Sequence, residues 1–448
     1  MPKLVRLALP VYIELLTAVV AVGLIDTFWV SGLGSEAVSA VTIATTTEHL
    51  ALGAILALTT GTTVLIGRRD GTAPLGPLIG TSWGLWAAYS VAVPVPGVLL
   101  REPLARLFTD DAATAGLAAD FYLVSLAGLP AFFAQTLVDG VFKGLGDTRT
   151  PMRTALLCNG LVIALDPLLI YGLDLGVPGA ALATVLARTV SLAVAIALLV
   201  RRLRRRPRRH AARDARQGGT NLREAATILR TGLPMSVDFL ARSLVGMVMA
   251  GIVGGHGVAA LAGYGIGLKI MLAGTMVFYA LRQAAMISTA RTDGDGAAAG
   301  SALRLGLAAG LGTALLLNLS ASPLIGLFSD DPAVTVEAVW FLRCMTLYLV
   351  PFGGLIAMGG VLQASGKGGR LLAATLAGFA VQLPLAYSLS RPIGITGVWL
   401  AMAAGATLTL AAMTVRRAWR EPYGAGRERA RGRGPRSTRT AEGPRSCR

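Results

Sequence analysis

Apolar runs long enough to cross a lipid bilayer recur along almost the whole chain, and they constrain its fold more than any other feature. A bilayer core of about 30 Å needs about 20 apolar residues of helix, and lipid offers no partner to an unbonded backbone group. The runs therefore predict an all-α integral membrane protein with twelve transmembrane helices. They occupy residues 8–30, 38–66, 78–100, 119–141, 153–171, 178–200, 232–253, 258–288, 301–321, 336–362, 372–390 and 395–415.

The composition agrees with this prediction. Of 448 residues, 54% are hydrophobic and only 15% are charged, which is too little polar surface for a soluble protein of this size. The first run contains Glu14 and Asp26 and has no cleavage site of small residues. We therefore expect it to remain as a helix and not to be removed as a signal peptide.

Four segments of the first half recur in the same order in the second half. Because each half holds an even number of runs, the halves share one orientation and are related by an axis along the membrane normal. We expect two pseudo-symmetric six-helix bundles, residues 1–200 and 231–415, around a central cleft. The pairs are VSGLGSEAVSA at 30–40 with VGGHGVAALAG at 253–263, PLARLFTDDAA at 103–113 with PLIGLFSDDPA at 323–333, GVFKGLG at 140–146 with GVLQASG at 360–366, and GVPGAALA at 176–183 with GITGVWLA at 394–401.

The excess of basic residues is confined to two segments. The net charge is +17, and residues 201–230 and 416–448 hold all of it, because the remaining chain has equal numbers of acidic and basic residues. Cytoplasmic segments of membrane proteins carry such an excess of Lys and Arg. We expect an Arg-rich cytoplasmic linker at 201–230, a basic, disordered cytoplasmic tail at 416–448, both termini in the cytoplasm, and a location in the plasma membrane.

Other classes of function find little support in the residues. Neither basic segment interleaves aromatic residues suited to base stacking, so we expect no nucleic-acid partner; contact with anionic membrane lipids is a secondary role. The three cysteines have no paired or metal-ligand spacing. The segment ASGKGG at 364–369 lacks the Ser or Thr that binds magnesium in a phosphate loop. We expect no enzyme activity, no cofactor and no metal centre.

Asp26 lies inside the first apolar run. A charged acid at membrane depth costs at least ~2.5 kcal/mol, and loss of hydration favours the neutral form of a carboxyl group. Such a group can exchange a proton or a cation for a substrate, whereas the structural alternative is a cap at a helix break. In the second half, the position equivalent to Asp26 is occupied by Met249. The acid is therefore not part of the scaffold that the two halves share.

Several segments resemble the multidrug and toxic compound extrusion (MATE) family, and most closely its prokaryotic DNA-damage-inducible branch. They are LP at 9–10, IDTFWVSGLG at 25–34, GVFKGLGDTRTPM at 140–152 and LDPLLIYGLDLGVPGAALAT at 165–184. The resemblance implies a secondary active antiporter that exports amphipathic, often cationic, compounds in exchange for H⁺ or Na⁺. We expect a small-molecule amphipathic substrate and a monomeric protein.

Matching of these motifs implies which residues couple transport to an ion. The first-span acid is Asp26, the fifth-span acid is Asp166, and a sixth-span hydroxyl is Thr184. An Asn often seen four residues before the fifth-span acid is Val162 here. Asn159 lies within about 20° of Asp166 on a regular helical wheel and is the candidate substitute. The resemblance implies that the coupling ion is H⁺ or Na⁺, and Asp26 and Asp166 are the residues that would hold Na⁺.

We expect a second group of side chains to face the cleft. Tyr12 precedes Asp26 by fourteen residues, which places both on nearly the same face of a regular helix, although a packing role is an equal alternative. Glu14 lies about 120° from Asp26 and either lines the cleft or extends toward the interface. The candidates are Tyr12, Glu14, Glu48, His49, Asp139, Asp238, Lys269 and Gln283.

Local explanations compete for three of these candidates. Asp139 precedes Lys143 by four residues, and an ion pair at the helix end is the favoured interpretation. Asp238 precedes Arg242 by four residues, and mutual neutralisation is favoured over a second ion site. His49 is the side chain whose ordinary titration lies nearest neutrality, but a local hydrogen bond is the more common role.

A flippase for lipids or lipid-linked oligosaccharides, from the same broader superfamily, is the alternative function. It needs a cationic central cavity for a diphosphate headgroup, for which Lys269, Arg282 and Arg343 are the candidates. The acidic motif of the first half favours amphipathic drugs over lipids.

Overall fold

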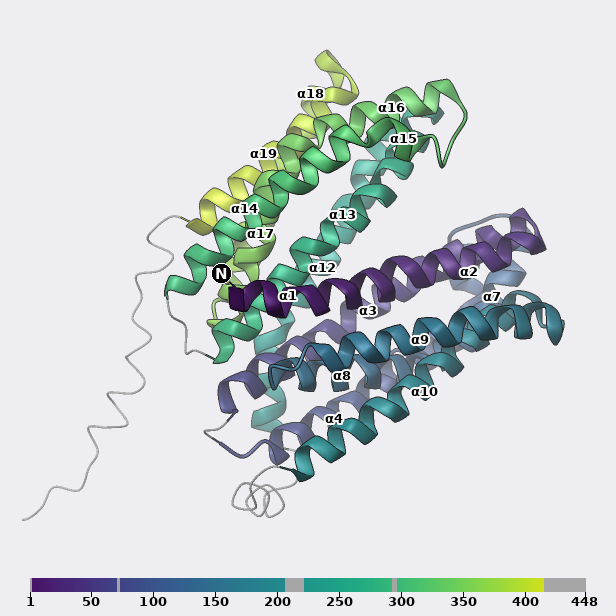
Figure 1. Ribbon diagram of the computed structural model, residues 1–448. Helices are drawn as coiled ribbons and strands as arrows, with labels where there is room; N and C mark the ends of the chain where they lie inside the picture. The colour runs from purple at the N-terminus through teal and green to yellow at the C-terminus, as the bar shows by residue number, and fades with distance from the viewer. Residues whose placement is uncertain (1, 71–72, 206–220, 292–295, 415–448) are drawn as a thin grey trace, which may run out of the picture.

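The computed structural model describes residues 2–70, 73–205, 221–291 and 296–414 (Figure 1). In these ranges the regular structure is entirely helical. Eleven helices are long and apolar enough to cross a membrane, and the count is twelve when a pair bent by 46° is taken as one span. The expected all-α membrane fold with twelve spans is therefore confirmed.

The N-terminal half supplies six of these spans. The first is a continuous rod in which a π-helical turn separates two α-helical segments, and the fourth is the bent pair of α7 and α8. The elements are α1 (Pro2–Leu15), η1 (Leu16–Ala21), α2 (Val22–Val30), η2 (Ser31–Leu33), α3 (Ser35–Arg69), α4 (Gly76–Ala92), α5 (Pro94–Leu99), α6 (Arg101–Arg106), α7 (Ala112–Ala127), α8 (Leu129–Gly144), α9 (Arg149–Pro167), η3 (Leu168–Gly172) and α10 (Gly176–Arg204).

The C-terminal half supplies the other six spans. Helix α12 begins at Leu222 and α10 ends at Arg204, so the helices extend into both ends of the predicted linker at 201–230. Residues 206–220 and the predicted tail at 416–448 lie outside the described residues. The elements are α12 (Leu222–Gly254), α13 (Val258–Arg291), α14 (Gly296–Leu319), α15 (Ala321–Ile325), α16 (Pro332–Cys344), α17 (Thr346–Ala364), α18 (Gly368–Ile393) and α19 (Ile395–Thr414).

The repeat in the sequence has a structural counterpart at the starts of α7 and α16. Asp111 accepts a hydrogen bond from the backbone N–H of Thr114 at 2.9 Å, and Asp331 accepts one from that of Ala333 at 2.8 Å. Hydrogen bonds from Thr114 hold the pKa of Asp111 below its usual value; the bond from the Thr114 side chain has the larger effect, followed by that from its backbone. The repeated Phe-Thr/Ser-Asp-Asp segment therefore caps equivalent helices in the two halves.

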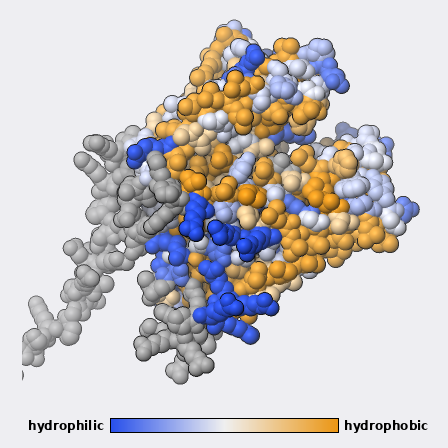
Figure 2. Space-filling view, in the orientation of Figure 1, coloured by the Kyte–Doolittle hydropathy of each residue, from blue (hydrophilic) through white to orange (hydrophobic). Residues whose placement is uncertain are grey.

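The two halves form separate lobes, the N-terminal half below and the C-terminal half above in Figure 1. Each lobe has its own apolar core, with Tyr122 and Phe133 buried in one, and Phe341 stacked edge-on against Trp399 in the other. The lobes converge at the end where α3 ends and α12 begins, and they separate at the opposite end, where Figure 2 shows a notch between them.

The lobes are joined by a close crossing of α3 and α12, the glycine crossing, which depends on Gly61 and Gly232. A Cβ atom on Gly232 would lie 1.8 Å from the carbonyl oxygen of Ala57, and one on Gly61 would lie 2.1 Å from that of Ile228. Only glycine permits such an approach of two backbones, and small residues serve this purpose widely between membrane helices.

A second set of contacts closes the converging end, and we call it the basic-end seal. The guanidinium of Arg68 donates to the carbonyl oxygen of Ala364 through Nε at 3.2 Å and Nη2 at 2.5 Å. Asp70 pairs with Arg291 at 3.0 Å. Val64 packs against Met286, Ala290 and Ala364 in an apolar cluster that spans both lobes. The seal therefore links α3 to α13 and α17.

Gly232→Ala should destabilise the protein, because overpacking costs about 1–3 kcal/mol and the obstructing atom belongs to a backbone that cannot move aside. The expected result is a lower midpoint of thermal unfolding, with less folded protein recovered in detergent. Gly246→Ala is the matched control, since it lies in the same helix with nothing within 4 Å of an added Cβ. Equal midpoints for the two variants would contradict the role of the crossing.

Candidate functional site

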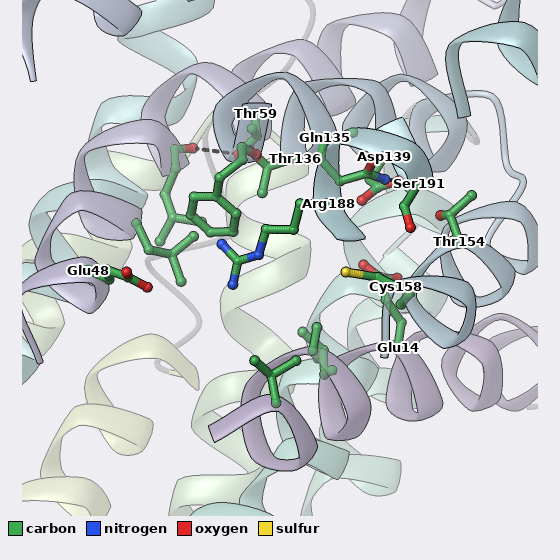
Figure 3. Close-up of a pocket in the computed structure, with 18 of the residues that line it drawn as sticks. Glu14, Glu48, Thr59, Gln135, Thr136, Asp139, Thr154, Cys158, Arg188 and Ser191 are labelled. Atoms are coloured by element: carbon green, nitrogen blue, oxygen red, sulfur yellow. Dashed lines mark hydrogen bonds between the residues drawn. The ribbon is translucent and has the colours of Figure 1, made fainter. Parts of the chain in front are cut away.

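A cavity of about 390 Å³ is lined by residues of both lobes. The N-terminal lobe contributes most of its polar wall, including Asp26 on α2, Glu48 on α3 and Asp139 on α8. From the C-terminal lobe, the wall includes Arg282 on α13 and Gln363 on α17. Figure 3 shows the acidic and hydroxyl side chains directed into this space from several helices.

Asp26 and Asp166 are deeply buried neighbours. Asp26 is 4% exposed and Asp166 is 0% exposed, and Asp166 acts electrostatically on the Asp26 carboxylate. Asp26 lines the cavity, whereas Asp166 is not among the lining residues. Within the described residues, Oδ1 of Asp26 and both carboxylate oxygens of Asp166 have no hydrogen-bond partner.

Two polar residues predicted to accompany these acids lie in the same wall. Asn159 and Thr184 both line the cavity, and in the described part of the chain Asn159 Nδ2 and Thr184 Oγ1 are buried without a partner. Val162, at the position where the family often has Asn, is fully buried. A buried polar group without a partner is costly, so this group of residues is suited to hold a further proton or ion.

The π-helical turn η1 explains which residues of the first span face the cavity. Because its hydrogen bonds run from i to i+5, such a turn inserts one extra residue, which rotates the register by about 100°. Glu14 is thereby brought to the face of Asp26, and both line the cavity. Tyr12 is turned away and packs with the apolar residues between α1 and α13. Tyr12 is therefore not in the cleft, and the equal alternative, a packing role, is the one that the structure favours.

Lys143 has a different partner from the one predicted. Its Nζ lies 2.6 Å from Oε1 of Glu14 on α1, whereas Asp139 accepts a hydrogen bond from Nε2 of Gln135 at 3.0 Å. All four side chains line the cavity. The expected ion pair of Asp139 with Lys143 is thus replaced by a pair between two spans, which sequence spacing on one helix cannot reveal.

Arg188 is a cavity residue that the sequence interpretation missed. It projects from α10 into the space between Glu48 and Cys158 (Figure 3), and its guanidinium lies 4.4 Å from the ring centroid of Phe132. It also acts electrostatically on Asp26. Its position in the sixth apolar run, four residues after Thr184, was the signal that could have identified it.

Asp238 forms a charge cluster inside the C-terminal lobe. Arg242 donates to it through Nε and Nη2, both at 3.2 Å, and Arg282 donates through Nη1 at 3.4 Å. The predicted pairing of Asp238 with Arg242 is present. Asp238 itself does not line the cavity, because both arginines surround its carboxylate.

Of the remaining residues predicted to face the cleft, some line the cavity and others do not. Glu48 and Gln283 line the cavity. Lys269 does not, because it is an exposed residue of α13. The side chain of His49 lies outside the described part of the structure.

A membrane protein with two repeated lobes around a buried polar cavity has the architecture of a transporter, and comparisons with known proteins agree. The family model described as MatE matches residues 10–168 and 234–388. The multidrug export protein MepA of Staphylococcus aureus is 23% identical over 92% of this chain and 92% of its own length. The chain belongs to the MatE family of membrane transporters, which are not enzymes.

Solved structures share the fold over the same extent. The Vibrio cholerae MATE transporter VcmN in its bent form has a TM-score of 0.82 and 21% identity, and the match covers 92% of this chain and 94% of that one. A multidrug resistance MATE family transporter of the MOP superfamily, in an outward-facing conformation, has a TM-score of 0.80 and 23% identity, with 91% and 93% covered.

Removal of one partner from the Glu14–Lys143 pair should destabilise the protein by about 3–5 kcal/mol, because a buried charge is left without compensation. We expect Glu14→Met and Lys143→Met each to lower the midpoint of thermal unfolding, and the double variant to recover most of the loss. Arg202→Met is the control, since its pair with Asp147 is more exposed and should be worth less than about 1 kcal/mol. Additive losses in the double variant would contradict the pairing.

Proposed function

We propose that this protein is a secondary active antiporter that exports amphipathic compounds from the cell in exchange for protons. The observation that carries the proposal is the adjacent pair of buried acids, Asp26 and Asp166. Oδ1 of Asp26 and both carboxylate oxygens of Asp166 lack hydrogen-bond partners in the described chain. An unpaired charge in such surroundings is strongly disfavoured, so each acid is poised to gain a proton. Asp26 lines the cavity, and proton binding there can compete with substrate binding.

Na⁺ is the alternative coupling ion. Sodium would require the same carboxylate oxygens, with Thr184 Oγ1 and the side-chain oxygen of Asn159 as further ligands, since hard cations prefer oxygen. We favour the proton because a single proton removes the charge of an acid without the need for several ligands. The wall around Asp26 also contains the cation Arg188, which acts on that carboxylate and would repel a second positive ion.

The cavity suits an amphipathic substrate. Apolar side chains such as Phe132, Leu56 and Met286 lie in its wall beside the acids Glu48 and Asp139. The relative MepA is named as a multidrug export protein, which supports the same class of cargo here. A flippase is less favoured, because two of its three predicted headgroup cations, Lys269 and Arg343, are exposed residues outside the cavity.

The proposed orientation places the basic-end seal toward the cytoplasm. Arg201, Arg202 and Arg204 lie in the last turn of α10, and Arg68 and Arg69 lie in that of α3. Cytoplasmic ends carry such an excess, so we assign the linker and both termini to the cytoplasm of a plasma-membrane protein. The notch between the lobes then opens outward, the state named for one solved relative.

In the proposed cycle, a proton from outside neutralises Asp26, and the N-terminal lobe rearranges and releases the substrate outward. The lobes then rock about the glycine crossing, and the basic-end seal opens. Asp26 loses its proton to the cytoplasm, and the next substrate enters. The seal has to break in every cycle, which is consistent with its construction from a few polar contacts beside a small apolar cluster.

Asp26→Asn should reduce gradient-driven export to the level of vesicles without protein, because the amide cannot exchange a proton at the cavity wall. Dye transport would be measured in proteoliposomes with an imposed pH gradient, an imposed Na⁺ gradient, or both. Glu36→Gln is the control, since Glu36 is exposed at the start of α3. Retained export by a well-folded Asp26→Asn variant would overturn the coupling role, and export driven by Na⁺ alone would replace the proton.

The orientation predicts opposite labelling of the two ends in intact cells. In a background with Cys158, Cys344 and Cys447 replaced by Ser, Asp330→Cys should react with a membrane-impermeant maleimide, and Arg202→Cys should react only after the cells are permeabilised. Both native residues are exposed. The reverse pattern would place the linker outside the cell.

A further inference from the structure

Arg282 is a buried cation whose hydrogen-bond donors are only partly paired within the described residues. Its side chain projects from α13, it is 3% exposed, and it lines the cavity. Its single recorded hydrogen bond in the described residues runs from Nη1 to Oδ2 of Asp238, at 3.4 Å. Its Nε and Nη2 groups are buried without any partner.

Asp238 cannot satisfy Arg282 in full, because it is already engaged by Arg242. Arg242 binds both oxygens of that carboxylate and also lies 5.7 Å and 5.6 Å from the ring centroids of Phe352 and Phe379. One carboxylate therefore faces two guanidinium groups. The cluster keeps a net positive charge, and the part of it that reaches the cavity is Arg282.

The free part of Arg282 has the geometry of an oxyanion site. Nε–H and the adjacent Nη2–H point in the same direction on one edge of the planar guanidinium, and this edge binds a carboxylate with two parallel hydrogen bonds. A third donor lies in the same wall, because Gln363 is 1% exposed, lines the cavity and has an unpartnered Nε2. Gln363 follows Gly359 and Gly360 by one turn of α17, and both glycines pack against Arg282.

We propose that Arg282 and Gln363 form an anion subsite that binds the carboxylate of a zwitterionic amphipathic substrate. The inference rests on the proposed export function, and it specifies the cargo further. The opposite wall carries Glu48 and Asp26, which suit the cationic end of the same molecule. The cavity thus has an acidic side in one lobe and a donor-rich side in the other, and a molecule with both charges matches the two walls at once.

Two dyes that differ only at one group provide the test. Rhodamine 110 carries a free carboxylate, and rhodamine 123 is its methyl ester. Binding of each dye to the purified full-length protein would be measured by fluorescence anisotropy at neutral pH, without any ion gradient. We expect the wild type to bind the carboxylate dye more tightly. Arg282→Gln should weaken binding of the carboxylate dye by about tenfold or more, and that of the ester by less than about twofold.

Two further variants separate the subsite from a general structural effect. Arg282→Lys keeps the buried charge but loses the paired donors, so the preference for the carboxylate dye should fall even where Arg282→Gln fails to fold. Lys269→Gln removes an exposed cation from the same helix at a position outside the cavity wall and leaves the Asp238 cluster intact, so the preference should persist. Equal weakening of both dyes by Arg282→Gln, or loss of the preference in Lys269→Gln, would overturn the subsite. Because binding needs no gradient, failure of proton coupling leaves this result intact.

Discussion

The close contact of α3 with α12 is the constraint on which the two-lobed structure depends. Gly61 and Gly232 allow these helices to touch backbone to backbone. The contact continues in both directions along the two helices, because Gly53 packs against Phe239 and Arg69 pairs with Glu224. The lobes also meet at the basic-end seal, along α1 and α13, and between α4 and α12, where Thr81 bonds to Asn221 and Glu224. A contact along one pair of helices suits a pivot, since it holds the lobes along one line beside the cavity.

The two lobes share a scaffold but differ in charge. The repeat preserves the helix caps at Asp111 and Asp331, which are needed wherever a helix begins at that turn. It does not preserve the ionisable groups of the cavity, so the N-terminal wall carries the acids and the C-terminal wall holds Arg282. The repeat thus accounts for the shared architecture, and the residues that differ between the halves give each wall its own chemistry. An asymmetric cavity follows from a nearly symmetric fold.

The sequence was sufficient for the twelve spans, the two halves and the burial of Asp26, because apolar runs and repeated segments can be recognised in the sequence without knowledge of contacts between helices. It was not sufficient for contacts between spans. Lys143 has an acid four residues before it, yet it pairs with Glu14 from another helix. Arg188 lies within an apolar run and faces the cavity. Tyr12 was misplaced because regular helical geometry was assumed across a π-helical turn that no residue pattern announces.

That turn has a conformational consequence. The segment Leu16–Ala21 holds one residue more than a regular helix needs, and this extra residue sets the rotation of α1 relative to α2. A change of the turn to α-helical hydrogen bonds, with no change in sequence, would rotate α1 by about 100° relative to α2. Glu14 would then leave the cavity face and Tyr12 would approach it, whereas deletion of the extra residue would keep Glu14 at the cavity.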